Sequence, residues 1–377
     1  MELSWLVVTA GALWWALCST VHIGSIVAGL LQPWARRRQA TRQDQPPISV
    51  VIPVKQLEPE ADAAFAATYA QSYPAFELII AAAEETSPAI EAARRGASRF
   101  PSVRTRFITN IRQVTPNPKV SSLACAISVA DHDLILVKDS NIRLADGQLA
   151  EFVRHLTPGV GLVCALSIAV SPKSVAADIE CAMMNGHHAP LLLAASALGW
   201  GIGFGKIMLF ERDDFLRAGG SAAIAHTFGD DQALAKALAS IGLRTVFAAS
   251  VVRQVVGRRS LRDVWDRQLR WMVIRRTEEP FAFYVEPFFS GAFAAVAGSI
   301  GAPFIGIDWW LMAAVTLAGR LSLETLFVAA KGWGWSWRFP LAGICRELLI
   351  PALWLRTWFA REVRWGGVPL DIPRGNT

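Results

Sequence analysis

The sequence predicts an α/β fold, a mostly parallel sheet with flanking helices, placed between transmembrane helices at both ends of the chain. Strands rich in β-branched residues alternate with helical segments in the middle of the chain, and long apolar stretches precede and follow them. The predicted parts are an N-terminal transmembrane anchor at 1–35, a cytoplasmic domain at 43–279 and a C-terminal membrane region at 280–377 with two or three helices and a short tail.

The composition is too apolar for a soluble enzyme. Of the 377 residues, 53% are hydrophobic and 15 are tryptophan, so a membrane-embedded part is expected. The net charge is +6, and the positive residues cluster beside the apolar stretches, which favours an anionic lipid bilayer rather than nucleic acid as the partner. The five cysteines have no metal-ligand spacing and are expected to be reduced packing residues.

The first predicted span covers residues 3–31, which include no Asp, Glu, Lys or Arg. At roughly 1.5 Å per residue this stretch is long enough to cross a bilayer. The alternative is a signal peptide, but the amino end lacks positive charge and the apolar run is longer than such peptides have. Arginines cluster at 36–42 and at 275–276, and positive charge marks the cytoplasmic side of a membrane. The domain between the two clusters is therefore predicted to face the cytoplasm.

Two further spans are predicted, at 281–307 and at 309–330. Arg320 and Glu324 lie four residues apart in the second, so we expect them to pair on one helical face that points into the protein. Charged residues and prolines interrupt the apolar segment 339–360, which is either a third span or a helix lying in the membrane interface.

The first strand of the central domain is predicted at 48–54, a continuous apolar run of the kind found in parallel strands covered on both faces. The elements that follow are a helix at 58–71, strands at 77–83 and 103–108, a helix at 120–130, strands at 134–137 and 159–166, and a helix at 232–241. This alternation predicts parallel strands joined by right-handed crossovers.

Ionic residues follow three of these strands: Lys55, then Glu84 and Glu85, then Asp139. Ligands of open α/β sheets bind outside the carboxyl ends of the strands, so Asp139 is a candidate for ligand contact. The alternative is an aspartate that opens a turn. No glycine-rich dinucleotide or Walker loop follows the first strand. A metal ion held by carboxylates can bind a diphosphate without such a loop, and a nucleotide site of that kind is predicted here.

Three further motifs each have a functional and a structural interpretation. Asp231 opens a helix, where it is either a general base or a favourable first-turn charge. Arg267, Arg270 and Trp271 share one side of a probable helix, where they suit a diphosphate or form a basic face near anionic lipid. Lys119 either approaches a phosphate or simply begins a helix.

Seven short motifs occur in an order and spacing that resembles one family over nearly the whole chain. They are VIPVK at 51–55, QSYP at 71–74, NPK at 117–119, KDSNIRL at 138–144, GDDQAL at 229–234, RQLRW at 267–271 and REVRWG at 361–366. The chain resembles the ceramide glucosyltransferases and their bacterial relatives, the family 21 branch of the family 2 glycosyltransferases. This resemblance implies a fold of the GT-A type and a bacterial inner-membrane location.

The resemblance also implies roles for individual residues. Asp139 corresponds to the metal-associated aspartate, with Mg²⁺ or Mn²⁺ as the cofactor, and Asp231 corresponds to the general base. The implied substrate- and nucleotide-binding residues are Pro53, Lys55, Glu84, Lys119, Asp230, Arg267, Arg270 and Trp271. Glu84 stands where the family has an aspartate, and Thr86, Ser87 and Pro88 stand where it has Asp-Asp-Pro.

The implied activity is inverting transfer of a hexose, glucose by default, from a UDP-sugar donor to the hydroxyl of a membrane lipid acceptor. Ceramide is the acceptor that the family name indicates, and diacylglycerol and a hopanoid are alternative acceptors. A processive polysaccharide synthase has similar motifs but usually more spans. A catalytically inactive lipid-binding protein would have no reason to keep Asp139, Asp231 and Arg270 together.

Two stretches near the acceptor region have open interpretations. Four glycines precede an apolar strand within 199–210, which indicates either a loop that admits a lipid headgroup or close backbone packing. His187 and His188 are predicted in a polar turn, and one of them is a candidate to line the acceptor entrance.

Overall fold

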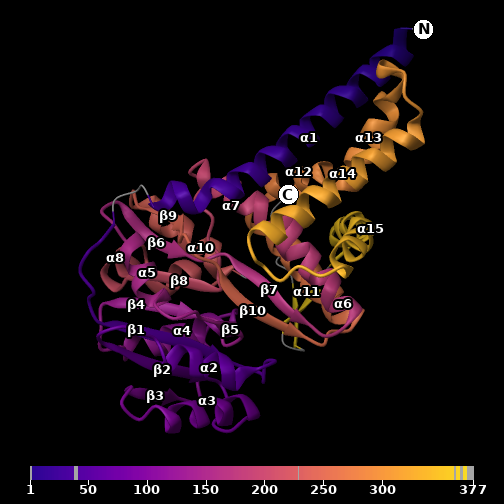
Figure 1. The fold of residues 1–377 in the computed structure, drawn as a ribbon. Helices are drawn as coiled ribbons and strands as arrows, with labels where there is room; N and C mark the ends of the chain where they lie inside the picture. Colours follow the sequence, from indigo (N-terminus) through magenta and orange to yellow (C-terminus); the bar gives the residue numbers. More distant parts are fainter. Residues whose placement is uncertain (1, 38–40, 228, 361, 366–367, 372–377) are drawn as a thin grey trace. The chain divides into compact units, whose positions relative to one another are not determined.

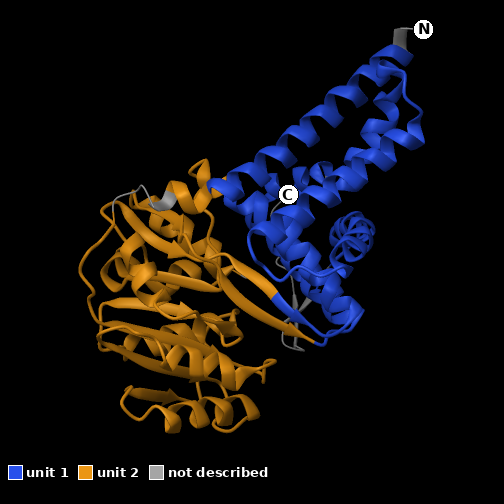
Figure 2. Cartoon of the chain, viewed as in Figure 1, with its two compact units in different colours: residues 1–31, 170–194, 258–377 blue, residues 32–169, 195–257 orange. Residues whose placement is uncertain are grey.

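The computed structural model describes residues 2–37, 41–227, 229–360, 362–365 and 368–371. The chain divides into two compact units, which Figure 2 shows in blue and orange. Unit 1 comprises residues 1–31, 170–194 and 258–377, and unit 2 comprises residues 32–169 and 195–257. Arg38, Arg361 and Gly366, which belong to the sequence patterns above, lie outside the described residues.

Unit 2 is built on a seven-stranded sheet with the order β3-β2-β1-β4-β8-β6-β9 (Figure 1). The strands are β1 (Ile48–Val54), β2 (Phe76–Ala82), β3 (Thr105–Ile108), β4 (Leu134–Lys138), β6 (Val160–Cys164), β8 (Ile207–Glu211) and β9 (Arg244–Phe247). β8 runs antiparallel to β4 and β6, and the other neighbours are parallel. The predicted mostly parallel sheet is therefore confirmed.

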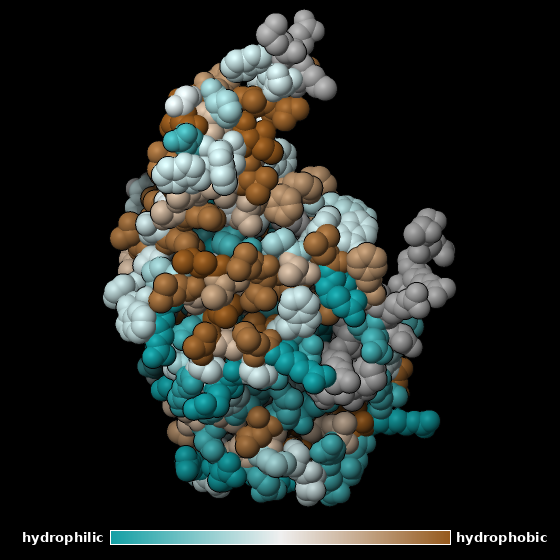
Figure 3. Space-filling view, turned by 90° about the vertical axis from the view of Figure 1, so that its right-hand side faces the viewer, coloured by the Kyte–Doolittle hydropathy of each residue, from teal (hydrophilic) through white to brown (hydrophobic). Residues whose placement is uncertain are grey.

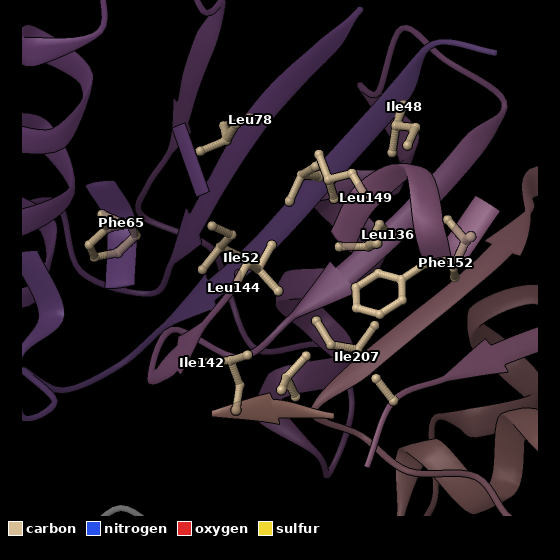
Figure 4. Close-up of a cluster of buried hydrophobic side chains, with 14 of the residues drawn as sticks. Ile48, Ile52, Phe65, Leu78, Leu136, Ile142, Leu144, Leu149, Phe152 and Ile207 are labelled. Atoms are coloured by element: carbon tan, nitrogen blue, oxygen red, sulfur yellow. The ribbon is translucent and has the colours of Figure 1, made fainter. Parts of the chain in front are cut away.

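The central strand β1 is buried almost throughout, as its apolar run predicts. Val51 pairs in register with Ile79 of β2 and with Val137 of β4, so the carboxyl ends of these three strands reach the same edge of the sheet. Figure 4 shows part of the core that the sheet and the adjoining helices enclose, where Phe65 and Phe152 are almost fully buried. Burial of one such side chain contributes about 1.5–3 kcal/mol.

The helices of unit 2 are α2 (Ala61–Tyr69), α3 (Pro88–Arg99), α4 (Pro118–Ser128), α5 (Gln148–His155), α8 (Arg212–Arg217), α9 (Gly220–Ile224) and α10 (Asp230–Ser240). The three that were predicted, α2, α4 and α10, are confirmed with ends shifted by up to three residues. A second sheet, β5-β10-β7, was not predicted from the sequence. Its strands are β5 (Ile142–Arg143), β7 (Ser167–Pro172) and β10 (Val252–Gly257), of which β5 is too short to show a pattern.

Lys138, the last residue of β4, has a fully buried side chain. Burial lowers the pKa of Lys138 to about 7, although the neighbouring charge of Asp139 opposes the shift. Since this value is below the ordinary pKa of 10.5, the unfolded chain binds more protons than the folded chain between about pH 7 and pH 10. The contribution of Lys138 to folding stability therefore rises with pH across this window.

We expect Lys138→Met to stabilise the protein most at low pH, because the variant avoids the cost of a buried ammonium group. The melting temperatures of the two proteins, followed by tryptophan fluorescence from pH 6 to pH 9.5, should differ most at pH 6 and converge toward pH 9.5. A difference that stays constant over this range would contradict the lowered pKa. Lys173→Met, in the polar segment after β7, is a control for the loss of a positive charge.

Unit 1 is mainly helical. Its elements are α1 (Glu2–Arg37), which extends into unit 2, α6 (Val175–Cys181), the π-helix η1 (Ala182–His188), α7 (Ala189–Ala197), α11 (Leu261–Glu278), α12 (Pro280–Val285), η2 (Glu286–Phe289), α13 (Gly291–Gly301), η3 (Ala302–Ile305), α14 (Trp309–Ala330), α15 (Arg338–Trp358), β11 (Glu362–Trp365) and β12 (Val368–Asp371). His187 and His188 therefore lie in a π-helix, not in the predicted turn.

Two of the described helices are long and apolar enough to cross a membrane: Ser4–Ala35 within α1, and α14. Figure 3 shows hydrophobic side chains gathered over part of one face of the molecule. The span predicted at 281–307 is not one helix, because four short elements, α12, η2, α13 and η3, divide it. One of the breaks falls at Ser290, whose side chain caps the start of α13.

The predicted pairing of Arg320 with Glu324 is wrong. Glu324 is paired instead with Arg346 of α15, whose Nη1 lies 2.6 Å from Glu324 Oε2. Arg346 also contacts its neighbour Glu347. Arg320 donates to the carbonyl oxygens of Cys18 and Phe289 at 3.4 and 2.8 Å. The sequence offers an i, i+4 partner, but a guanidinium from another helix reaches the buried carboxylate.

Candidate active site

The carboxyl end of β4 is surrounded by charged side chains from four parts of unit 2. Asp139 directly follows β4, Lys119 stands in the first turn of α4, Asp230 opens α10, and Lys206 precedes β8. Lys206 was not singled out from the sequence. Its backbone carbonyl accepts a hydrogen bond from Asp139 N at 3.2 Å, which fixes the two residues side by side.

Asp139 contacts two ammonium groups. Lys206 Nζ lies 2.8 Å from Asp139 Oδ2, and Lys119 Nζ lies 3.5 Å from Asp139 Oδ1. Burial raises the pKa of Asp139, but the two lysines outweigh burial and lower the pKa to about 2. Asp139 is therefore ionised at neutral pH. Asp139 also opens a turn, because its carbonyl oxygen accepts from Ile142 N at 3.2 Å, and its role in ligand contact stays a prediction.

Of the two roles that the sequence left open for Lys119, the helix start is confirmed, and the approach to a phosphate stays a prediction. It belongs to the first turn of α4, and its ammonium bridges Asp230, at 2.9 Å, and Asp139. Burial lowers the pKa of Lys119, but the carboxylates of Asp230, Asp139 and Asp231 raise it well above its ordinary value. Lys119 thus stays charged, and a positive charge is held among three carboxylates.

Asn117 places α4 so that Lys119 reaches this position. The Asn117 side-chain oxygen caps the helix by accepting from Lys119 N at 3.0 Å. Asn117 Nδ2 donates to the carbonyl oxygen of Thr227 at 3.1 Å, which ties the start of α4 to the segment before α10. Pro118 stands at the first helical position, where its missing N–H costs nothing. The NPK motif is therefore a helix start that presents a lysine.

Asp231 is held by backbone N–H groups rather than by a cation. Gly205 N donates to Asp231 Oδ2 at 2.7 Å, and Gln232 N donates to Asp231 Oδ1 at 2.9 Å. Burial and the charge of Asp230 raise the pKa of Asp231, while Lys119 and the two N–H groups oppose the shift. A carboxylate with a raised pKa and a fixed orientation suits a general base.

The glycine-rich segment before β8 packs tightly against the start of α10. A Cβ at Gly203 would lie 2.0 Å from the carbonyl oxygen of Asp231, and a Cβ at Gly205 would lie 3.0 Å from Asp231 Oδ2. Gly203 N also donates to Gln232 Oε1 at 2.7 Å. At these two glycines the structure therefore bears out close backbone packing, and the neighbour they pack against is the candidate base.

Three predicted nucleotide residues lie at the ends of the neighbouring strands. Pro53 is within β1, Lys55 follows β1 and is exposed, and Glu84 is exposed two residues after β2. The strand ends meet at one edge of the sheet, as predicted. Glu84 does not join the cluster around Asp139 in the described structure, and its role stays a prediction.

Arg267, Arg270 and Trp271 lie in unit 1 on α11, where all three are half-buried. Arg267 Nη1 lies 3.3 Å from Oε1 of Glu180, a fully buried residue of α6, and Arg259 Nε lies 3.7 Å from Glu180 Oε2. Glu180 was not found from the sequence, although a carboxylate inside the apolar stretch around it was a usable signal. It orients Arg267. The diphosphate role of the motif stays a prediction.

The residues around Asp139 fit a divalent cation. Three carboxylates and two ammonium groups give the cluster a formal charge of −1, which favours an added cation. Asn141, two residues after Asp139, has a buried side-chain oxygen with no hydrogen-bond partner. Carboxylate and amide oxygens are the ligands that Mg²⁺ and Mn²⁺ prefer. Asp139 and Asn141 are therefore the candidate ligands.

Known proteins agree with this architecture. The mannosyltransferase PcManGT from Pyrobaculum calidifontis, solved in complex with GDP-Man and Mn²⁺, has a similar fold, with a TM-score of 0.54 and 16% identity over 92% of this chain and 98% of that chain. This similarity confirms the predicted glycosyltransferase fold of the GT-A type.

Two relatives are similar in sequence. A ceramide glucosyltransferase from Komagataella phaffii is 31% identical over 113 residues, which are 29% of this chain and 22% of that protein. Ceramide glucosyltransferase 1 from Caenorhabditis elegans is 21% identical over 85% of this chain and 70% of its own length. The model of the family described as glycosyl transferase family 21 matches residues 17–377. The chain belongs to glycosyl transferase family 21 and is a glycosyltransferase.

Proposed function

We propose that this enzyme transfers a hexose, glucose by default, from a UDP-sugar to the hydroxyl of a membrane lipid, with inversion at the sugar carbon. The observation that carries the proposal is Asp231, a carboxylate with a raised pKa that two backbone N–H groups orient beside the lysine–aspartate cluster. Family membership and the two similar ceramide glucosyltransferases support a lipid acceptor, with ceramide first and diacylglycerol or a hopanoid as alternatives.

In this proposal Asp231 accepts the proton of the acceptor hydroxyl as its oxygen attacks the sugar carbon. The UDP diphosphate leaves from the opposite side of the sugar, so one displacement inverts the configuration. Lys119 and Lys206 carry the positive charge that stabilises the departing diphosphate. Mg²⁺ or Mn²⁺, held by Asp139 and Asn141, would supply further positive charge for the same phosphates.

We also propose that the enzyme is an integral protein of a bacterial inner membrane with unit 2 in the cytoplasm. The two apolar helices, α1 and α14, support membrane association. The arginines beside α1 and in the last turn of α11 support the orientation, because positive charge marks the cytoplasmic side.

The deciding experiment follows labelled sugar from UDP-glucose or UDP-galactose into ceramide, diacylglycerol and a hopanoid, with purified protein in detergent and Mg²⁺ or Mn²⁺. Transfer to a lipid that Asp231→Asn abolishes would support the proposal and identify the acceptor. Incorporation into a long polymer would favour a processive synthase instead. UDP-sugar hydrolysis without transfer to any of these lipids would overturn the proposed acceptor class.

The metal proposal predicts that Asp139→Asn weakens Mn²⁺-dependent donor binding about 100-fold, because the variant loses the charge of a ligand carboxylate. Titration calorimetry with UDP at several Mn²⁺ concentrations measures this effect. Asp133→Asn is the matched control, since the Asp133 side chain is 89% exposed and stands before β4, at its opposite end. Donor binding that is indifferent to EDTA would argue against a metal at Asp139.

A further inference from the structure

A second group of polar side chains lies in unit 1 and has no part in the mechanism above. It consists of His187 and His188 from η1, Arg275 from α11 and Glu286 from η2, and we call it the unit 1 polar cluster. Arg275 Nη1 lies 3.0 Å and His188 Nε2 lies 3.5 Å from Glu286 Oε1. The rings of His187 and His188 are 5.3 Å apart. A π-helix such as η1 frequently marks a functional site.

Two buried atoms of this cluster have no hydrogen-bond partner and no ion-pair contact: His187 Nε2 and Arg275 Nε. Glu286 Oε1 is not one of them, because it is ion-paired with Arg275 Nη1. His187 is only 3% exposed. An unsatisfied buried polar atom costs about 1–3 kcal/mol, so two in one place indicate that another molecule supplies the missing partners.

The ligand atoms of His187, His188 and Glu286 lie within 4.8 Å of one another, a spacing that also suits a metal ion. Charge argues against one. Arg275 already neutralises Glu286, so a divalent cation between two neutral histidines would leave an uncompensated charge of +2 in the interior. A neutral ligand that forms hydrogen bonds meets the same atoms without this cost. The cluster therefore favours a neutral polar group.

The unpaired atoms define the chemistry of that group. Arg275 Nε can only donate a hydrogen bond, and neutral His187 donates or accepts according to its tautomer. The ligand must therefore accept from Arg275 and either accept from or donate to His187, which a hydroxyl group can do. Unit 1 also holds α14 and most of the candidate membrane span Ser4–Ala35, so a lipid is the ligand expected near these segments.

We infer that the unit 1 polar cluster binds the neutral headgroup of the lipid acceptor, a hydroxyl with an amide, an ester or a second hydroxyl beside it. This inference rests on the proposed function and adds the residues that recognise the acceptor. His187 is its central residue, because it is the most buried of the four and is tied to no charged partner.

The test compares wild type, His187→Phe and His187→Gln, with His22→Phe as the matched control. His22 is a buried histidine of α1 that also has an unpartnered Nε2 but lies outside the cluster. The apparent KM for each lipid is measured in mixed micelles, the KM for the UDP-sugar is measured at saturating lipid, and lipid-independent UDP-sugar hydrolysis and the melting temperature report on the fold. Metal content is measured by mass spectrometry.

We expect His187→Phe to raise the KM for the lipid about tenfold, the effect of one lost hydrogen bond, with donor KM and hydrolysis unchanged. His187→Gln should restore most of the affinity, and His22→Phe should leave lipid KM as in wild type. An unchanged lipid KM in His187→Phe would overturn the inference, and so would a metal ion that co-purifies with wild type and is lost in this variant. If wild type transfers to no lipid, the proposed function itself fails.

Discussion

Asp231→Asn is expected to lower kcat by about 100- to 10,000-fold, the range in which a lost general base falls. Asparagine has the same shape as aspartate, and its oxygen can still accept from Gly205 N, but its NH2 group cannot accept from Gln232 N. We therefore expect a small loss of stability and a donor affinity near that of wild type. Stopped-flow or radiometric turnover, with UDP binding and the melting temperature alongside, measures all three quantities. A variant that turns over at the wild-type rate would remove Asp231 from the mechanism.

The pH profile gives a second, independent check on this assignment. A base must be deprotonated to work, so kcat/KM should fall as the pH drops through the pKa of Asp231, which burial and Asp230 raise above its ordinary value. Asp230 raises the pKa of Asp231 by its negative charge, whereas Lys119 lowers it, and Asp230→Asn removes the first of these two effects. The acidic limb should therefore move to lower pH in Asp230→Asn, whereas a limb that does not move would assign it to another group.

Much of the sheet could be predicted because it depends on local sequence. β1 was predicted at its observed residues, since seven consecutive apolar or small residues rich in β-branching are typical of a covered parallel strand. The position of Asp139 followed from β4 in the same way. The family motifs then supplied Lys119, which the structure joins to Asp139.

The missed features depend on contacts between distant segments. Lys206 is 67 residues from Asp139, and Glu180 is 87 residues from Arg267, so no local pattern links either pair. The partner of Glu324 was mistaken for the same reason, because Arg346 belongs to a different helix. Sequence patterns identify which residues carry charge, but the choice of partner is made by packing.

Gly203→Ala is expected to be the most damaging of the small substitutions in the chain. The new Cβ would meet the carbonyl oxygen of Asp231 at 2.0 Å, far inside van der Waals contact, and that atom is backbone at the start of α10. The helix start must shift, and Asp231 moves with it. Overpacking of this kind costs about 1–3 kcal/mol or more, and a displacement of about 1 Å at a catalytic group lowers turnover about 100-fold.

Two neighbouring glycines provide matched controls, because none of the three has a left-handed φ. A Cβ at Gly205 would lie 3.0 Å from Asp231 Oδ2, so it would press on the side chain of the base but not on the backbone of α10. A Cβ at Gly201 would meet nothing closer than Thr245 at 3.8 Å. Melting temperature and kcat should therefore fall in the order Gly201→Ala, Gly205→Ala, Gly203→Ala, with the first near wild type. If all three variants lose activity equally, the segment acts through its flexibility, as expected of a loop that admits a headgroup, and close packing against Asp231 is not the reason for its glycines.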